Sequence, residues 1–268
     1  MTCFPNAKIN IGLRITGKRK DGFHNIESVF YPIPLAETLE FVEAPEFRLS
    51  LSGKPVPGNL EDNLLFKAFH FFQEKFQIPN LHIYLNKQIP MGAGLGGGSA
   101  DLAFFVRELN TNFNVGLGFI ELESIVAQWS SDAPFFIRNT PAWVSGRGEV
   151  LSPLDFSLKG KYLTLVNPGI HVSTKEAYAG VTPVPAKPWK EVVLQGIEHW
   201  NDCVINDFEK SVMVQYPTLA QLKLELQQTG ASFVQMSGSG SSFFALSNEP
   251  LDLEDLSNKY ALVKSLRL

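Results

Sequence analysis

Apolar positions recur along the chain with two different periods, and each period predicts one kind of element. Between residues 63 and 76 apolar side chains return every three or four positions, which predicts a helix. Residues 81–85 alternate between apolar and polar positions, which predicts a strand buried on one face. Short β-rich stretches separated by Pro, Ala and Glu predict three further strands, at 26–33, 38–43 and 46–52.

The same mixture of periods continues to the end of the chain. Helices are expected at 99–109, 121–129, 175–179, 190–200 and 218–229, and strands at 161–169, 232–236 and 242–246. The proline-rich stretch 181–188 is expected to be a surface loop. The mixed order predicts an α+β fold of two halves. Because the chain turns polar and glycine-containing around 152–160, we place the two domains at 1–155 and 156–268.

Composition and charge narrow the classes of protein that the chain can be. Its 268 residues carry 23 basic and 27 acidic side chains, a formal charge of −4, which argues against a broad nucleic-acid surface. The basic residues Lys18, Arg19 and Lys20 are interpreted as a solvated turn. No apolar run approaches the roughly 18–20 residues of a membrane span, and no secretory leader is seen. With only Cys3 and Cys203, neither a disulfide framework nor a cysteine metal site is expected, and a cytoplasmic protein is predicted.

Five of the seven residues from 92 to 98 are glycine. Gly92, Gly94 and Gly97 fit the dinucleotide pattern G-x-G-x-x-G, but no strand ending in an acidic residue follows about 20 positions later. A P-loop is excluded because no lysine follows the glycines. A simple turn remains an alternative, although so many glycines cost conformational entropy. We therefore interpret the loop as an anion cradle, with Ser99 capping a helix whose dipole also favours an anion.

Four segments, in order along the chain, resemble the GHMP kinase superfamily of galactokinase, homoserine kinase, mevalonate kinase and phosphomevalonate kinase. Residues 90–99, Pro-x-x-x-Gly-Leu-Gly-Gly-Gly-Ser, resemble its second signature. Residues 4–30 resemble the first signature of the branch that acts on a cytidine-diphosphate-linked methylerythritol. Residues 130–137 with 146–149 are similar to the stretch around the family's catalytic aspartate, and 234–246 to its third, glycine-rich signature.

The resemblance implies a two-domain α+β GHMP kinase fold with the active site in the cleft between the domains. It implies ATP-dependent phosphorylation of an alcohol on the cytidine-diphosphate-linked methylerythritol, a step of the non-mevalonate isoprenoid route. ATP is the co-substrate, bound against the N-terminal half, and Mg²⁺ arrives with it. No protein metal ligand is assigned, since Ala100 stands where many relatives carry a serine. The other expected partner is the small-molecule substrate, with no nucleic acid and no membrane, in a monomer or weak homodimer.

By the same resemblance, Lys8 and Asp132 are the catalytic pair. A carboxylate near an alcohol can take its proton as the oxygen attacks phosphorus. A lysine near both groups keeps the carboxylate ionised and offsets charge on the transferring phosphoryl group. From the residues alone, a solvated lysine and an aspartate in a turn or helix cap are the simpler interpretations.

The resemblance assigns the remaining site residues to two groups. Substrate recognition falls to five side chains, with a phenylalanine where the family often has tyrosine: Asn10, Phe23, His24, Thr174 and Tyr178. ATP binding falls to the adenine-side residues, the glycine loop and the third signature: Asn63, Leu64, Pro90, Gly92, Ala93, Gly94, Leu95, Gly96, Gly97, Gly98, Ser99, Gly238, Ser239 and Gly240. A hairpin turn is an equally good interpretation of the last three.

Three other functions are weighed against this one. Another small-molecule kinase of the superfamily, for mevalonate or homoserine, is disfavoured by residues 21–28, which offer a nucleobase clamp. A nucleotide-binding protein without catalysis is disfavoured by the presence of both Lys8 and Asp132. An NAD-dependent oxidoreductase is disfavoured by the missing acidic partner of the glycine loop.

Overall fold

The computed structural model describes residues 1–183, 189–200 and 203–268, which cluster into two compact units. Each unit is assembled from stretches that lie far apart in the sequence. The first consists of Met1–Ala7, Leu35–Met91 and Gly96–Thr140, and the second of Lys8–Pro34, Gly92–Leu95 and Pro141–Leu268. The boundary expected between residues 155 and 156 falls inside the second unit, and a division into domains at that point stays a prediction.

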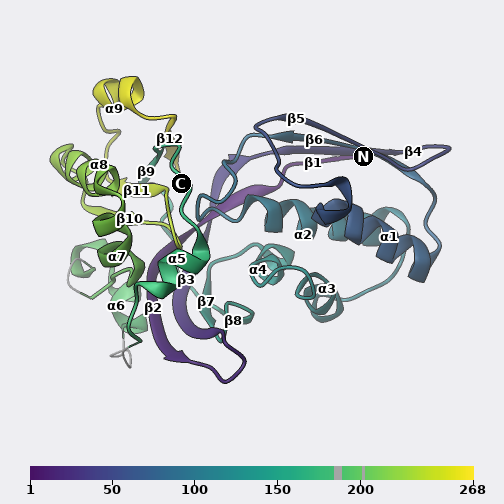
Figure 1. The fold of residues 1–268 in the computed structure, drawn as a ribbon, viewed down its shortest axis with the longest axis horizontal. Coiled ribbons are helices and arrows are strands. Elements are labelled where there is room, and N and C mark those ends of the chain that lie inside the picture. Colours follow the sequence, from purple (N-terminus) through teal and green to yellow (C-terminus); the bar gives the residue numbers. More distant parts are fainter. Residues whose placement is uncertain (184–188, 201–202) are drawn as a thin grey trace. The chain divides into compact units, whose positions relative to one another are not determined.

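The first unit contains a four-stranded sheet in the order β1-β4-β6-β5, in which only β5 and β6 are parallel. Its elements are β1 (Thr2–Cys3), β4 (Thr38–Glu43), β5 (Arg48–Gly53), η1 (Leu60–Asp62), α1 (Leu64–Phe76), β6 (Leu81–Lys87), α2 (Gly97–Asn112), α3 (Phe119–Val126) and α4 (Ala133–Arg138). In Figure 1, α1 and α2 run along one side of this sheet. The edge-to-face contact of Phe41 on β4 with Phe105 on α2, at 5.3 Å between ring centroids, belongs to this core.

Local sequence explains why these elements begin and end where they do. Asn63 precedes α1 and its side chain accepts the Leu65 amide at 2.9 Å, which satisfies one free N–H of the first turn. The helix ends at Gln77, which adopts a left-handed φ of 56°. Along β6 the even and odd positions alternate between exposed and buried, as the pattern at 81–85 predicts.

The second unit contains two antiparallel sheets, ordered β2-β3-β7-β8 and β10-β11-β9-β12. Its elements are β2 (Asn6–Lys18), β3 (His24–Ala36), β7 (Ala142–Ser145), β8 (Val150–Pro153), β9 (Tyr162–Asn167), α5 (Thr174–Ala179), α6 (Lys190–Gln195), η2 (Ile197–His199), α7 (Phe208–Gln215), α8 (Pro217–Gln228), β10 (Phe233–Met236), β11 (Phe243–Ser247), α9 (Glu254–Lys259) and β12 (Leu262–Arg267). The first two residues of β2 and the last two of β3 belong to the first unit.

One apolar cluster holds the second unit together. Leu13 and Ile15 of β2 and Ile26 of β3 share it with side chains from α7, α8, β9 and β11. Backbone groups join the same pieces, because Leu13 forms an isolated parallel bridge with Asn206. The early strands and the last third of the chain therefore bury one common core.

The predicted elements are largely confirmed, with one clear error. The strands at 26–33, 38–43, 46–52 and 81–85 and the helix at 63–76 correspond to β3, β4, β5, β6 and α1. The single helix expected at 190–200 is wrong, because Gly196 with φ 114° ends α6 and a short 3₁₀ turn follows. Of the loop expected at 181–188, residues 184–188 lie outside the described residues. Within the described part of the chain, no helix is both long enough and apolar enough to span a bilayer.

Candidate active site

The glycine loop between β6 and α2 takes a backbone path that requires its glycines. Gly92, Gly94 and Gly96 have φ values of 60°, 76° and 72°, in the left-handed region that side chains disfavour. Gly96 precedes α2, so the helix begins at Gly97 and not at Ser99 as expected. Ser99 is therefore the third helical residue, and the expected side-chain cap is wrong: its hydroxyl contacts the Ser130 hydroxyl at 2.8 Å. The first-turn amides of Gly97, Gly98 and Ser99 remain without helical partners, as an anion cradle requires.

In the second unit, the first part of this loop packs against the third glycine-rich segment. A Cβ on Gly94 would lie 1.9 Å from the Ser237 carbonyl oxygen, so only glycine fits there. The Ser237 hydroxyl donates to the Gly94 carbonyl at 2.8 Å, and the Ser242 amide donates to the Ala93 carbonyl at 3.3 Å. A Cβ on Gly238 would meet the Gly94 Cα at 3.3 Å. Two of the predicted phosphate segments are thus in direct contact.

The third segment also has the hairpin geometry of its alternative interpretation. It connects β10 to β11, which pair antiparallel, and the Gly240 amide donates to the Ser237 carbonyl at 3.0 Å. The Asn206 amide group donates to the carbonyl oxygens of Met236 and Gly238, both at 2.8 Å. Ser239 lies 3.4 Å from the Thr174 hydroxyl, so the hairpin reaches a predicted substrate residue. The segment is a fixed turn that joins the glycine loop to α5.

Lys8 lies on β2 and is only 3% exposed. Its ammonium group donates to the Asn10 side-chain oxygen at 2.5 Å and to the Gly94 carbonyl at 3.3 Å. It also lies 4.4 Å from the ring centroid of Phe30. The Lys8 amide donates to the Leu95 carbonyl at 3.0 Å. The structure therefore brings the predicted catalytic lysine to the glycine loop. Its burial excludes the alternative interpretation of Lys8 as a solvated lysine.

Asn10 is buried and serves as a connector within the second unit. Its backbone N–H donates to the Ser237 hydroxyl at 3.1 Å, and its side-chain amide donates to the Ser28 hydroxyl at 3.0 Å. Asn10 is absent from the residues that line the pocket described below. Its predicted contact with substrate stays a prediction, and its visible role is to orient Lys8.

Asp132 lies in the first unit, immediately before α4. It occupies the N-cap position, but its side chain makes no capping hydrogen bond. The simple interpretation of this aspartate as a helix cap therefore fails on geometry, even though its position is the expected one. The residue is half-buried, and two positions before it the Ser130 hydroxyl contacts the Ser99 hydroxyl at 2.8 Å.

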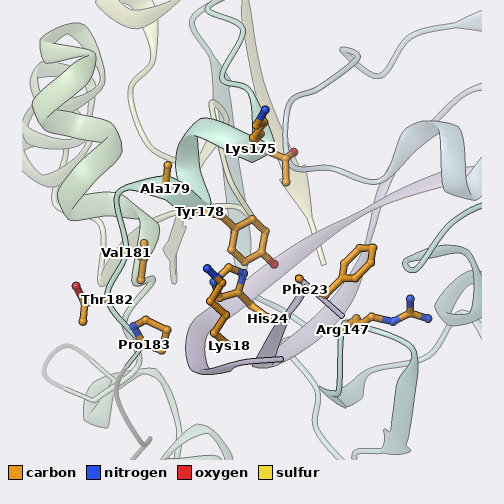
Figure 2. A pocket seen from close by; sticks show the side chains of 12 residues that line it. Lys18, Phe23, His24, Arg147, Lys175, Tyr178, Ala179, Val181, Thr182 and Pro183 are labelled. Carbon is orange, nitrogen blue, oxygen red and sulfur yellow. The ribbon is translucent and has the colours of Figure 1, made fainter. Parts of the chain in front are cut away.

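A pocket of about 700 Å³ gathers four of the five predicted substrate residues. His24 is the first residue of β3 and Phe23 directly precedes it, whereas Thr174 and Tyr178 belong to α5. The His24 and Tyr178 rings stack at 4.8 Å with 17° between their planes. Figure 2 shows this stacked pair on one side of Phe23. Flat apolar faces with polar ring atoms are suited to a heterocyclic base.

Three basic residues complete the lining of this pocket, and sequence reasoning missed them. Lys18, Arg147 and Lys175 line it together with the four aromatic and polar residues, and none of the described lining residues is acidic. Lys18 was interpreted as part of a solvated turn, but it ends β2 and points into the pocket region in Figure 2. Arg147 lies within the stretch 146–149 that resembles the family, and the resemblance assigns it no role. The excess of positive charge favours an anionic ligand.

A second, smaller pocket of about 120 Å³ lies in the first unit. Asn63 and Leu64 line it, as does Gly98 at the start of α2, so these predicted ATP residues are brought together. Val56, Leu85 and Met91 add apolar surface. Pro90 lies between β6 and the glycine loop but does not line this pocket. An apolar slot beside a helix N-terminus can take an adenine base next to phosphates.

A buried ion cluster forms one wall of the smaller pocket. The Lys87 ammonium bonds the Glu37 carboxylate and also the Asp101 carboxylate, the latter at 2.7 Å. Burial, together with the Asp101 charge, raises the pKa of Glu37 from 4.5 to about 8 despite Lys87. Burial also raises the pKa of Asp101. The two carboxyl groups of this cluster therefore hold protons more tightly than exposed carboxyl groups do.

No metal centre is evident in the part of the chain that the structure describes. There, no three or more His, Cys, Asp or Glu side chains are grouped so that they could hold an ion. Cys3 and Cys203 are free, and burial raises the pKa of the Cys3 thiol to about 12.

Comparison with known proteins identifies the architecture. Residues 63–140 match the model of the GHMP kinases N terminal domain, and residues 194–263 match that of the GHMP kinases C terminal. A solved 4-(cytidine 5'-diphospho)-2C-methyl-D-erythritol kinase superposes with a TM-score of 0.85 at 28% identity, over 100% of both chains. A mevalonate kinase from Methanococcus jannaschii shares the fold, with a TM-score of 0.70 at 15% identity over 99% and 96% of the chains. The predicted GHMP kinase fold is confirmed.

Closer relatives narrow the family. A 4-diphosphocytidyl-2-C-methyl-D-erythritol kinase from Bacteroides fragilis is 48% identical over 251 residues, which cover 92% of each chain. One from Parabacteroides distasonis is 45% identical over 258 residues, 96% of this chain and 95% of its own. The chain therefore belongs to the GHMP kinases and, within them, to the 4-diphosphocytidyl-2-C-methyl-D-erythritol kinase family.

Proposed function

We propose that the chain is the ATP-dependent kinase of the 2-hydroxyl of 4-diphosphocytidyl-2-C-methyl-D-erythritol, in the non-mevalonate isoprenoid pathway. One observation carries this proposal: the larger pocket combines three ring side chains with three basic groups, of which Lys18 and Lys175 are assigned to the diphosphate. Rings suit a pyrimidine and cations suit a diphosphate, whereas mevalonate and homoserine offer neither an aromatic base nor a diphosphate.

In this proposal, Phe23, His24 and Tyr178 hold the cytosine. Phe23 lacks the tyrosine hydroxyl common in the family but keeps the stacking face. His24 offers one donor and one acceptor for the edge of the base. Thr174, hydrogen-bonded to Ser239, lies between the pocket and the third glycine-rich segment. Asn10 assists by orienting Lys8.

ATP is proposed to place its adenine near Asn63 and Leu64, and its phosphates at the glycine loop. Unpaired amides at the start of α2 and the glycine backbone provide donors for phosphate oxygens. Gly238, Ser239 and Gly240 support this loop through the contact of Gly94 with Ser237. Mg²⁺ is proposed to arrive with ATP and to neutralise charge between the β- and γ-phosphates. Ala100 offers no hydroxyl to it.

The chemistry itself is assigned to Asp132 and Lys8. Asp132 accepts the proton of the attacking hydroxyl, or orients that hydroxyl toward phosphorus. Lys8 is held by Asn10 and Gly94 and provides a fixed positive charge for the transferring phosphoryl group. Because its position is set before substrate binds, little reorganisation is needed during the reaction.

The proposed setting is the cytoplasm, and the proposed assembly a monomer or weak homodimer. Two free thiols, one of them buried, fit a reducing compartment.

A coupled ADP-release assay with four acceptors tests the proposal. The acceptors are the cytidine-diphosphate-linked methylerythritol, free methylerythritol phosphate, mevalonate and homoserine. ADP is expected with the first acceptor alone. If it appears with mevalonate or homoserine alone, both the nucleobase pocket and the assigned reaction are wrong. ATP binding without turnover of any acceptor would favour a nucleotide-binding protein without catalysis.

A further inference from the structure

Arg147 lies against the aromatic side of the larger pocket. Its guanidinium carbon is 5.1 Å from the centroid of the Phe23 ring, and both residues line the pocket. In Figure 2, Arg147 extends beside Phe23 on the side away from Tyr178 and His24. The Phe23 ring therefore has the Arg147 cation over it.

The backbone fixes the position of Arg147 relative to Phe23. Arg147 lies in the turn between β7 and β8, flanked by Gly146 and Gly148 with φ values of 72° and 121°. Its amide donates to a Glu149 carboxylate oxygen at 2.6 Å. The Ile26 amide donates to the Gly146 carbonyl at 2.8 Å, which ties this turn to β3 just after Phe23. The turn that carries Arg147 and the segment that carries Phe23 are thus held next to each other.

Phe23 itself has few other constraints on its ring. The residue is 53% exposed, and its backbone is held by hydrogen bonds to the Asp21 side chain and to the Arg19 amide. A phenylalanine has no hydroxyl with which to anchor its ring. A cation over the ring of an exposed phenylalanine favours one ring orientation over the others.

We propose that Arg147 is a positioning residue for pyrimidine recognition, in that its guanidinium holds the Phe23 ring so that the opposite face stacks on the base. This inference rests on the proposed function, since it assumes that the pocket takes a cytidine diphosphate group.

A double-mutant cycle tests this role, with cytidine 5'-diphosphate as the probe and calorimetry as the measurement. Arg147→Met keeps the aliphatic stem and removes the charge, and Phe23→Leu removes the ring. We expect Arg147→Met to weaken binding about two- to five-fold when Phe23 is present. In the Phe23→Leu background the same change is expected to have almost no effect, because there is no ring to hold.

Kinetics separate positioning from a general loss of structure. Arg147→Met is expected to raise the KM for the cytidylyl substrate by the same factor and to leave kcat and the KM for ATP unchanged. Arg147→Lys keeps a cation and is expected to restore most of the affinity. Arg107→Met is the matched control, since Arg107 lies 5.4 Å from the Phe104 ring outside this pocket. Arg107→Met should change neither the KM for the cytidylyl substrate nor kcat.

Each contrary result identifies which inference fails. An equal loss of affinity in both Phe23 backgrounds means that Arg147 contacts the ligand directly, and no loss in either means that it has no role. Both results overturn the positioning role while leaving the proposed function intact. If the wild type neither binds cytidine 5'-diphosphate nor phosphorylates the cytidylyl substrate, the proposed function fails and the role of Arg147 with it.

Discussion

Lys8 is a buried charged residue whose ammonium group is stabilised and oriented by its polar neighbours. An ammonium group with 3% exposure loses most of its hydration, which is costly unless polar groups replace the water. The Asn10 side chain, the Gly94 carbonyl and the Phe30 ring are three of the groups around it. Asn10 is in turn held by Ser28 and Ser237, so the lysine is oriented by a chain of hydrogen bonds.

The proposed role of Asp132 can be tested by replacing the carboxylate with an amide of the same shape. Asp132→Asn is expected to lower kcat by roughly 10²–10⁴-fold, because an amide cannot accept the hydroxyl proton. The Kd for ATP, measured by calorimetry, should stay within about two-fold, as adenine and phosphate contacts come from other residues. Asp155→Asn, at an exposed aspartate, is the control and should behave as wild type. Near-normal turnover of Asp132→Asn would remove this residue from the mechanism.

At this scale, the sequence predicted residues with strong motif context and missed those without it. Phe23, His24, Thr174 and Tyr178 were predicted, and they line one pocket. Lys18 was misinterpreted because a basic run beside Asp21 and a glycine is usual for a solvated turn. Arg147 and Lys175 gave no signal, since a pocket position depends on the fold and not on the residue type.

Among elements, the contact between two glycine-rich turns is the most demanding in the second unit. Gly94 has a left-handed φ, and its Cα faces the Ser237 carbonyl so closely that a Cβ would lie 1.9 Å from the oxygen. By contrast, a Cβ on Gly98 meets no atom within 4 Å. The composition of the loop indicated backbone freedom at these glycines but could not say which of them was indispensable, because the neighbouring turn lies more than 140 residues away in the chain.

Alanine substitutions distinguish the two kinds of glycine. Gly94→Ala is expected to lower the free energy of unfolding by about 1–3 kcal/mol, from steric overlap and a strained φ. Gly98→Ala should leave it unchanged or raise it by up to about 1 kcal/mol, since alanine favours a helix more than glycine does. Urea unfolding followed by circular dichroism measures both. Equal stability of Gly94→Ala and wild type would mean that the two turns are not packed together in solution.

The ion cluster of the first unit predicts a pH dependence of stability. Glu37 has a pKa of about 8 when folded and an ordinary value of 4.5, so the folded state binds its proton more tightly. Stability from this group is complete below pH 4.5 and is lost as the pH rises to about 8, by at most about 1.4 kcal/mol per pH unit. Glu37→Gln keeps the shape without the titration, and its stability should fall less over this range.

Urea unfolding of wild type and Glu37→Gln at several pH values between 5 and 9 measures the difference. Groups common to both proteins cancel, so the gap between the two curves reports on Glu37 and on its influence on Asp101. The gap is expected to change up to about pH 8 and then to level off. Parallel curves over the whole range would show that Glu37 is ionised in the folded protein and that its proton is not retained.

For elements, periodicity was a good guide wherever one face of a helix or strand is buried. It failed between residues 190 and 200, where Gly196 breaks a stretch that is otherwise apolar enough for one helix. It also failed at the start of α2, which was expected at Ser99. The left-handed conformation of Gly96 lets the helix begin at Gly97. Both errors arise from glycine conformations, which a hydrophobic pattern does not encode.

At the scale of the whole molecule, the compact units interleave along the chain, and the polar, glycine-containing stretch near residue 155 lies inside the second of them. The domain boundary expected at that stretch stays a prediction. The N-terminal strands β2 and β3 supply Leu13, Ile15 and Ile26 to the apolar cluster of the second unit. The Asp207 side chain accepts the Ile15 amide at 2.8 Å, so polar contacts join the same pieces. A local signal could not predict such a long-range assembly, and the predicted catalytic cleft between domains stays a prediction.

This interleaving predicts that residues 156–268 do not fold alone. Without β2 and β3, the cluster that includes Val166 and Phe208 would lose its cover and expose apolar surface. We expect this fragment to unfold without a cooperative transition in urea and to show poor dispersion of amide resonances. A second fragment joins residues 8–34 to 141–268 through a flexible linker, which restores β2 and β3 together with their sheet partners β7 and β8, and it should show a cooperative transition. A cooperative transition of the 156–268 fragment by itself would support the boundary at 155 and would mean that β2 and β3 are dispensable for this core.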